Sequence, residues 1–167
     1  MAEVHLRKRR RLKRKEIAAH RDSIERQLGV RLFDEDEAVD AAEVLGKTVI
    51  LFDGVVVAIV LGERTFPTVR GLLRQLPSRR HVTVDMGAVP FIYNGADVMA
   101  PGIVDADRAI EPGDLVWILD ERNMRPLAIG ESLLSGPDMV AHEKGKAVKS
   151  MHHVGDALWK LDEPATS

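Results

Sequence analysis

NGADVMAPGI, residues 94–103, is the stretch that most constrains the fold of this chain. It holds two glycines and a proline around a short apolar core, with a single acid, Asp97, and no base. Glycine accepts positive φ and lets other groups approach its backbone closely. Exposed backbone N–H groups at such a turn can bind an anion without any charged side chain. The alternative is structural: the glycines only form a tight turn in a small barrel, with Val98 and Ile103 in its core.

Short apolar segments separated by turn residues surround this stretch. Their composition predicts strands at 81–86, 114–120, 126–134, 146–154 and 157–161, and one short helix at 136–145. Several short strands with frequent turn signals are typical of a small β-barrel or sandwich.

The first half of the chain mixes helix and strand signals. A helical pattern runs from Leu6 to Leu28 and ends at Gly29, before a short strand at 30–33 and a short helix at 38–45. TVILFDGVVVAIV, residues 48–60, predicts a hairpin through Asp53-Gly54. FPTVRGLLRQLP, residues 66–77, predicts a helix with Pro67 in its first turn, a stripe of Val69, Leu72, Leu73 and Leu76, and a stop at Pro77.

These elements predict an α+β fold in two parts. We expect an α+β domain at 1–78, built from a basic N-terminal helix, a hairpin and a helix. A β-barrel domain at 79–162 and a flexible polar tail at 163–167 follow.

The composition narrows the functional classes. The chain has 167 residues, 45% of them hydrophobic, which is enough for a packed core. It has no cysteine, so disulfides and thiolate chemistry are excluded. No apolar run reaches membrane-spanning length, and no signal peptide precedes the charged N-terminus. We therefore expect a soluble cytoplasmic protein with no membrane association.

Four motifs together resemble a known module. They are VDMGAVPFIYNGADVMAPGI at 84–103, IEPGDLVWI at 110–118, LAIGES at 127–132 and HHVGDALWKL at 152–161. In this order and spacing they resemble the PUA domain, a small RNA-binding β-barrel. With FPTVRGLLRQLP ahead of them, the chain is similar to the malignant T-cell amplified sequence family and its archaeal relatives, in which an α+β pre-PUA domain precedes the PUA barrel.

The resemblance implies a function and a site. It implies a non-enzymatic protein of the translation apparatus that binds tRNA or rRNA at the small ribosomal subunit, in initiation or recycling. It also implies an RNA-binding groove lined by Gly95, Ala96, Met99, Pro101 and Gly102, with Gly130 on the adjacent strand. Eukaryotic relatives work with the density-regulated protein, but they lack so dense a basic N-terminal run. An archaeal-type protein is the better match, and its protein partner stays unknown.

The charges are arranged in blocks. Residues 7–15 hold eight Lys or Arg in nine positions, and residues 34–43 hold six acids and no base. Arg9, Arg10 and Arg11 are candidates for salt-dependent phosphate contacts. Three alternatives are a solvated helix face, a localisation-like tract, and pairing with the acidic block inside the molecule.

Other side chains are candidates for RNA contact. Arg70 and Arg74 share a helix face, Arg79 and Arg80 follow that helix, and Tyr93 beside the glycine turn could stack on a base. The alternatives are solubilising arginines and a tyrosine at the rim of the core. Trp117 and Trp159 lie among apolar neighbours and are expected in the core.

Catalytic and metal-binding motifs are not found in the sequence. His152 and His153 would point to opposite faces of a strand, so they cannot bind one metal together, and we expect one to pack and the other to be exposed. The sequence has no phosphate-binding loop or nucleophile elbow. We expect no cofactor, no metal and no catalysis. An RNA-modification enzyme or its RNA-targeting component, and a protein-interaction adaptor, are the competing hypotheses.

Overall fold

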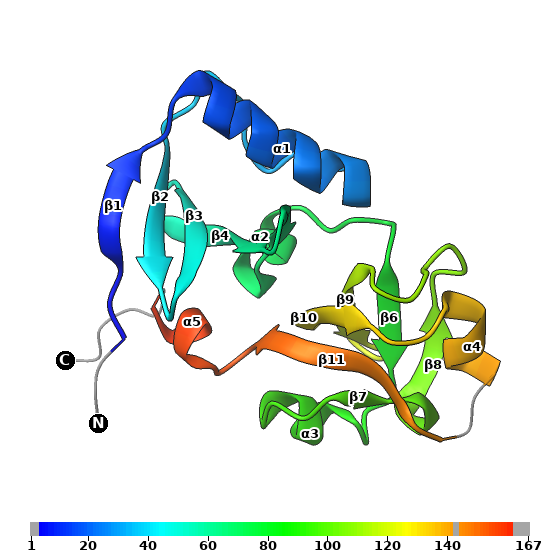
Figure 1. Ribbon diagram of the computed structural model, residues 1–167. Coiled ribbons are helices and arrows are strands. Elements are labelled where there is room, and N and C mark those ends of the chain that lie inside the picture. Colours follow the sequence, from blue (N-terminus) through cyan, green and yellow to red (C-terminus); the bar gives the residue numbers. More distant parts are fainter. Residues whose placement is uncertain (1–3, 142–143, 162–167) are drawn as a thin grey trace. The chain divides into compact units, whose positions relative to one another are not determined.

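The computed structural model describes residues 4–141 and 144–161 (Figure 1). These residues form two compact units, the first from the described parts of 1–76 and 157–167 and the second from those of 77–156. Each unit is a β-sheet with short helices, which confirms the α+β fold class. The predicted tail at 163–167 lies outside the described residues.

Unit 1 contains an antiparallel sheet of five strands in the order β1-β2-β3-β4-β5. The strands are β1 (Arg7–Arg11), β2 (Val39–Val44), β3 (Lys47–Phe52), β4 (Val55–Leu61) and β5 (Arg64–Pro67). Asp53 and Gly54 have φ of 56° and 77° and join β3 to β4, which confirms the predicted hairpin. Strand β5 was not predicted.

Helix α1 (Arg14–Leu28) covers the β5 edge of this sheet. Its side chains Ile17, Ile24 and Leu28 are buried, and Gly29 ends it in the left-handed conformation with φ 74°, as predicted. Gln27 Nε2 donates to the Thr65 carbonyl over 2.9 Å. The polar groups at this edge of the sheet therefore have partners on the helix.

The prediction of a basic N-terminal helix is wrong for residues 7–11, which form the edge strand β1. On a helix, basic residues three or four apart would repel one another. On the strand they reach separate carboxylates: Arg9 and Arg11 both bind Asp40, at 2.9 and 2.6 Å, and Lys8 lies 3.8 Å from Glu43. Pairing between the basic and acidic blocks is therefore confirmed.

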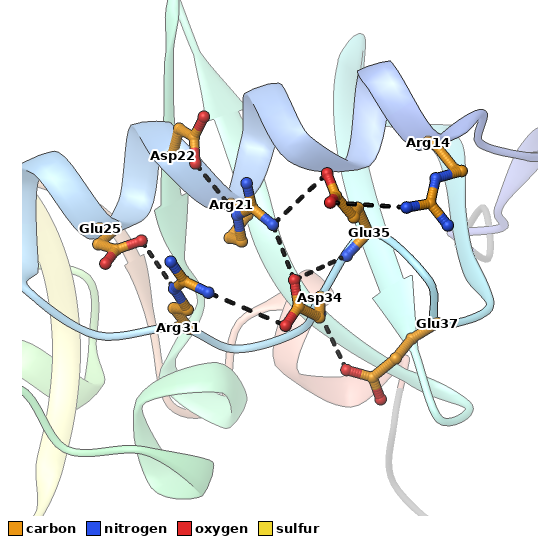
Figure 2. Close-up of polar contacts among 8 residues, drawn as sticks. All are labelled: Arg14, Arg21, Asp22, Glu25, Arg31, Asp34, Glu35 and Glu37. Carbon is orange, nitrogen blue, oxygen red and sulfur yellow. Dashed lines mark hydrogen bonds and ion pairs between the residues drawn. The ribbon is translucent and has the colours of Figure 1, made fainter.

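Residues 30–33 are not a strand, contrary to the prediction. Figure 2 shows how this segment and its acidic continuation are held against α1 by ion pairs. Arg21 binds Asp34 over 2.7 Å and lies 3.7 Å from Glu35, and Arg31 binds Glu25 over 2.9 Å. The Arg21 hydrogen bond lowers the pKa of Asp34. Side-chain pairing with the helix, rather than backbone pairing with a strand, positions this connection.

The predicted helix at 38–45 is also wrong, because most of these residues form β2. Val39, Ala41 and Val44 are buried, and the strand pairs with β3 in continuous register from Val39 opposite Phe52 to Val44 opposite Lys47. Burial in the sheet and pairing with β3 override the helix propensity of alanine and glutamate.

Helix α2 (Val69–Arg74) begins two residues later than predicted. Pro67 ends β5, and Thr68 is the N-cap, its hydroxyl oxygen accepting the Gly71 N–H over 3.2 Å. A Cβ on Gly71 would lie 2.0 Å from the Val57 carbonyl oxygen, so glycine is required where α2 meets β4. The predicted stripe is buried only in part, because Leu73 and Leu76 are exposed.

The last described element is α5 (Ala157–Lys160), a helix where a strand was predicted. It belongs to unit 1. The Arg70 guanidinium lies 3.8 Å from the centroid of the Trp159 ring and donates to the Trp159 carbonyl over 3.0 Å. Trp159 is therefore half-buried in this contact rather than in a core, whereas Trp117 is buried as predicted.

Unit 2 contains a six-stranded, barrel-like sheet in the order β7-β11-β10-β9-β6-β8. All pairs are antiparallel except β6 with β9. The strands are β6 (His81–Val84), β7 (Val98–Met99), β8 (Ile103–Ala106), β9 (Leu115–Asp120), β10 (Pro126–Ser132) and β11 (Lys146–His153). The helical segments are α3 (Val89–Tyr93), the 3₁₀ turn η1 (Ala100–Gly102) and α4 (Gly136–Ala141).

Four of the strands and α4 match predicted segments, whereas α3, β7, η1 and β8 were not predicted. The core of the unit is aliphatic and includes Val82, Ile92, Val98, Ile118 and Val148. None of the described helices in either unit has the length and apolar character needed to cross a membrane.

Candidate functional site

Unit 2 carries an open groove of about 680 Å³ beside α3, β7 and η1. All residues that line the groove lie within 85–102, except Lys146 on β11. Its lining residues are Asp85, Gly87, Ala88, Phe91, Ile92, Ala96, Asp97, Val98, Met99, Pro101, Gly102 and Lys146.

One wall of the groove is the short helix α3. Its start is fixed by Asp85, whose Oδ1 accepts the Ala88 N–H over 2.9 Å and whose own N–H donates to the Gly102 carbonyl over 2.9 Å. Val89 and Ile92 point into the core, so Phe91 is left outward with 66% of its surface exposed. The Phe91 ring is therefore outside the core and is available for contact with a flat group in the groove.

Two glycines allow the backbone turns that bound the groove. Gly95 has φ 86° and ends α3 by donating its N–H to the Ile92 carbonyl over 2.9 Å. A Cβ there would lie 3.2 Å from His153 Nε2. Gly102 packs against Ala88, where a Cβ would lie 3.1 Å from the alanine methyl. The backbone conformation at Gly95 therefore favours glycine, and Gly102 leaves little room for a side chain; Gly95 is exposed and Gly102 is half-buried.

The charges at the groove are few and mostly paired. Lys146 Nζ lies 3.3 Å from Asp97 Oδ2, and Asp97 Oδ1 accepts the Ser150 N–H over 2.9 Å. That backbone hydrogen bond, assisted by Lys146, lowers the pKa of Asp97. With Asp85, the groove lining holds two carboxylates and one ammonium group. Such a surface does not attract phosphate strongly and instead suits an uncharged, flat group.

The site residues predicted at the glycine turn and near it lie in different places. Ala96, Met99, Pro101 and Gly102 line the groove, and Gly95 lies beside it at the end of α3. Tyr93 is exposed on α3 but does not line the groove. Gly130 is buried in β10, where a Cβ would lie 2.2 Å from the Lys149 carbonyl oxygen. Gly130 therefore has a packing role at the β10–β11 irregularity.

The predicted arginines do not line the groove. Arg70 stacks on Trp159, and Arg74 lies 3.4 Å from Asp53 and 5.8 Å from the Phe52 ring centroid. Arg79 is exposed and its carbonyl accepts the Trp117 indole N–H. Arg80 lies 3.8 Å from Asp114. Arg9, Arg10 and Arg11 belong to β1 of unit 1 and bind Asp40 or Glu16.

Sequence reasoning missed Phe91, Asp85 and Lys146. The signal for Phe91 was present: once Val89 and Ile92 are assigned to the buried side of a helix, the residue between them must point away. Lys146 is distant in sequence, and only the pairing of β11 with β7, with Lys146 opposite Met99, brings it to the groove.

The histidines occupy structural positions. His152 is buried and its Nδ1 lies 2.9 Å from Asp156, while His153 is half-buried with Nδ1 2.8 Å from the Val154 carbonyl. Over the described range, 4–141 and 144–161, His, Asp and Glu side chains do not gather in threes as metal ligands would.

Comparison with known proteins identifies the family. The PUA domain model matches residues 80–154. An uncharacterized protein of Methanocaldococcus jannaschii is 44% identical over 113 residues, which cover 68% of this chain and 70% of that protein. The chain belongs to the PUA-domain protein family.

Two further relatives match a shorter part of their own length. Translation machinery-associated protein 20 of Eremothecium gossypii is 33% identical over 105 residues, 59% of this chain and 58% of that protein. The Malignant T-cell-amplified sequence 1 homolog of Drosophila melanogaster is 37% identical over 80 residues, 46% of this chain and 44% of that protein. The chain thus spans about half the length of these relatives.

Solved structures share the whole architecture. A hypothetical protein of Pyrococcus horikoshii superposes with a TM-score of 0.85 at 38% identity, covering 93% of this chain and 99% of that one. A PUA domain protein of Thermoplasma acidophilum gives a TM-score of 0.80 at 29% identity, covering 92% and 98%. The likeness therefore includes unit 1 as well as the PUA domain.

Proposed function

We propose that this PUA-domain protein binds tRNA or rRNA at the small ribosomal subunit during translation initiation or recycling, and that the groove of unit 2 holds an unstacked nucleotide. The observation that carries this proposal is Phe91, an exposed aromatic ring on the wall of a mostly apolar groove. Sequence-tolerant stacking on such rings is a common way for proteins to hold single-stranded nucleic acid.

The base, rather than the phosphate, fits inside the groove. Phe91, Met99 and Pro101 offer apolar surface to the flat face of a base. The two carboxylates would repel a phosphate, so the sugar–phosphate backbone stays at the rim, where Lys146 is exposed. Lys146 can then exchange part of its contact with Asp97 for a phosphate oxygen.

Backbone groups complete the contact. The turn 94–96 and the η1 segment expose Gly95 and Pro101 and leave Gly102 half-buried, so a ribose can approach without meeting long side chains. Proteins read RNA largely at single-stranded loops, bulges and ends, where bases are already splayed out. Single-stranded segments of tRNA or rRNA therefore suit this groove, and the name of the translation machinery-associated relative supports an RNA of the translation apparatus as the ligand.

Crosslinking locates the contact directly. The full chain is irradiated with tRNA, and separately with purified small-subunit rRNA, and crosslinked peptides are identified by mass spectrometry. We expect adducts in peptides that contain 89–102. Adducts confined to other parts of unit 2, with none in 89–102, would refute the groove. Cosedimentation with small ribosomal subunits tests the proposed place of action, and failure to cosediment would refute it.

The competing enzymatic hypothesis has a separate test. The protein is incubated with total tRNA and cofactor-containing extract, and the nucleosides are quantified by mass spectrometry. We expect no protein-dependent change in nucleoside composition. A new modified nucleoside would identify a modification enzyme or its targeting component instead.

A further inference from the structure

The basic residues of β1 and the start of α1 are not used by the groove. We refer to Arg7–Arg11 together with residues 13–15 as the basic strip. All eight of its side chains are exposed, and the one apolar residue within the run, Leu12, is buried. The Leu12 N–H donates to the Val39 carbonyl over 2.9 Å, which anchors the strip to the sheet.

The strip carries more positive than negative charge. Among its recorded ion pairs, five cations share four carboxylates: Asp40 for Arg9 and Arg11, Glu43 for Lys8, Glu16 for Arg10 and Glu35 for Arg14. Within the described parts of the chain, Arg7, Lys13 and Lys15 form no ion pair with a carboxylate. The strip is therefore a fixed surface with surplus positive charge.

The ion pairs orient the arginines without using all their donors. Arg9 and Arg11 each bind Asp40 through Nε, at 2.9 and 2.6 Å. A guanidinium group has five N–H donors, so its two terminal nitrogens can still bind another anion. One carboxylate thus holds two guanidinium groups, and the set keeps one net positive charge.

The edge of β1 is poorly suited to adding another strand. Lys8 has φ 52°, and the pairing with β2 shifts between Arg7 and Arg10, which is the geometry of a bulge. Bulges and dense positive charge are the means by which edge strands avoid pairing with other chains. The centre of a protein–protein interface usually contains exposed aromatic or large apolar side chains, and the strip has none.

We propose that the basic strip is a second RNA-contact surface, which binds the phosphate backbone without regard to sequence. The inference rests on the proposed function, since it takes RNA as the ligand, but it places a separate site on unit 1. Nucleic-acid interfaces are far more positively charged than protein interfaces, and charge-neutralising contacts make binding strongly salt-dependent.

The test uses the double variant Arg7→Gln/Lys15→Gln, which leaves the ion pairs of Lys8, Arg9, Arg10, Arg11 and Arg14 in place. Arg26→Gln/Lys160→Gln removes two exposed cations elsewhere in unit 1 and is the matched control. Fluorescence anisotropy with labelled tRNA and with an unrelated RNA of equal length gives Kd between about 50 and 200 mM salt, the range over which phosphate contacts have large effects. Circular dichroism melts verify that both variants are folded.

We expect the strip variant to bind both RNAs on the order of tenfold more weakly, and its log–log salt slope to fall by between about 1 and 2, since each phosphate contact contributes ~0.7–0.9. The control should keep the wild-type slope. An unchanged Kd and slope would overturn the inference, and so would equal losses in both variants. Binding of polyglutamate, a model of an acidic protein segment, is measured in the same way. If the strip variant binds RNA normally but no longer binds polyglutamate, the strip binds an acidic protein instead of RNA. Crosslinks in 89–102 test the groove independently of all these results.

Discussion

Truncating Phe91 to alanine separates RNA contact from folding at the groove. Because 66% of Phe91 is exposed, only about a third of its surface is removed from water in the folded chain. Complete burial of a phenylalanine contributes about 1.5–3 kcal/mol, so the variant should lose about 0.5–1 kcal/mol of unfolding free energy. Stacking on one base is worth ~1–3 kcal/mol, so RNA should bind roughly 5- to 140-fold more weakly.

The assay compares Phe91→Ala with Met124→Ala in anisotropy titrations of labelled tRNA and rRNA fragments. Met124 is 52% exposed and lies outside the groove, so its truncation removes a similar apolar group without touching the site. Phe91→Leu adds a second comparison, since it keeps bulk and loses the π face. Tight tRNA and rRNA binding by folded Phe91→Ala protein, equal to that of Met124→Ala, would refute the stacking role and with it the proposed groove.

Three further predictions concern stability. Gly130→Ala places a Cβ 2.2 Å from the Lys149 carbonyl oxygen, and this overpacking should lower the free energy of unfolding by about 1–3 kcal/mol or more. The variant should unfold at a lower urea concentration, and an unchanged urea midpoint would contradict the packing role. Arg70→Met removes the stack on Trp159 and its hydrogen bonds and should cost about 1–3 kcal/mol in the same assay, with Arg26→Met as a neutral comparison. The hydrogen bond from Arg10 lowers the pKa of Glu16 from 4.5 to about 2. The stabilising effect of this ion pair is therefore complete above pH 4.5 and is lost as the pH falls toward 2. Glu16→Gln should flatten the dependence of unfolding free energy on pH across that window, and a dependence identical to that of the unaltered protein would show that the pair contributes nothing.

The β-hairpin and the PUA motifs were predictable because their signals are local. Asp53-Gly54 between two β-branched runs needs only its own backbone preference to form a turn, and Gly29 needs only to follow a helix. The groove could be predicted in part for the same reason, since Ala96, Met99, Pro101 and Gly102 lie within a few residues of one another. The proposed boundary between domains at 78/79 and the RNA-contact roles of these residues stay predictions.

Other features depend on partners that are distant in sequence. Residues 7–11 and 38–45 were assigned to helices because each has local helical features, yet they pair with each other as β1 and β2. The resemblance implied that Gly130 lies on the strand adjacent to the groove, and only the strand pairing shows that its Cα packs against the Lys149 carbonyl. Arg70 was grouped with RNA-contacting arginines because its stacking partner, Trp159, is 89 residues away.

The sequence by itself determined the α+β class, the hairpin, the order of motifs that marks a PUA domain, and the separation of charge into two blocks, since each follows from short-range pattern. Only the tertiary structure decided that the two blocks neutralise one another in part across β1 and β2, and that Phe91 and Lys146 share a groove with the glycine turn. The physical reason is that backbone preferences act over a few residues. The strand pairing and burial that bring side chains together act between segments that one-dimensional patterns do not connect.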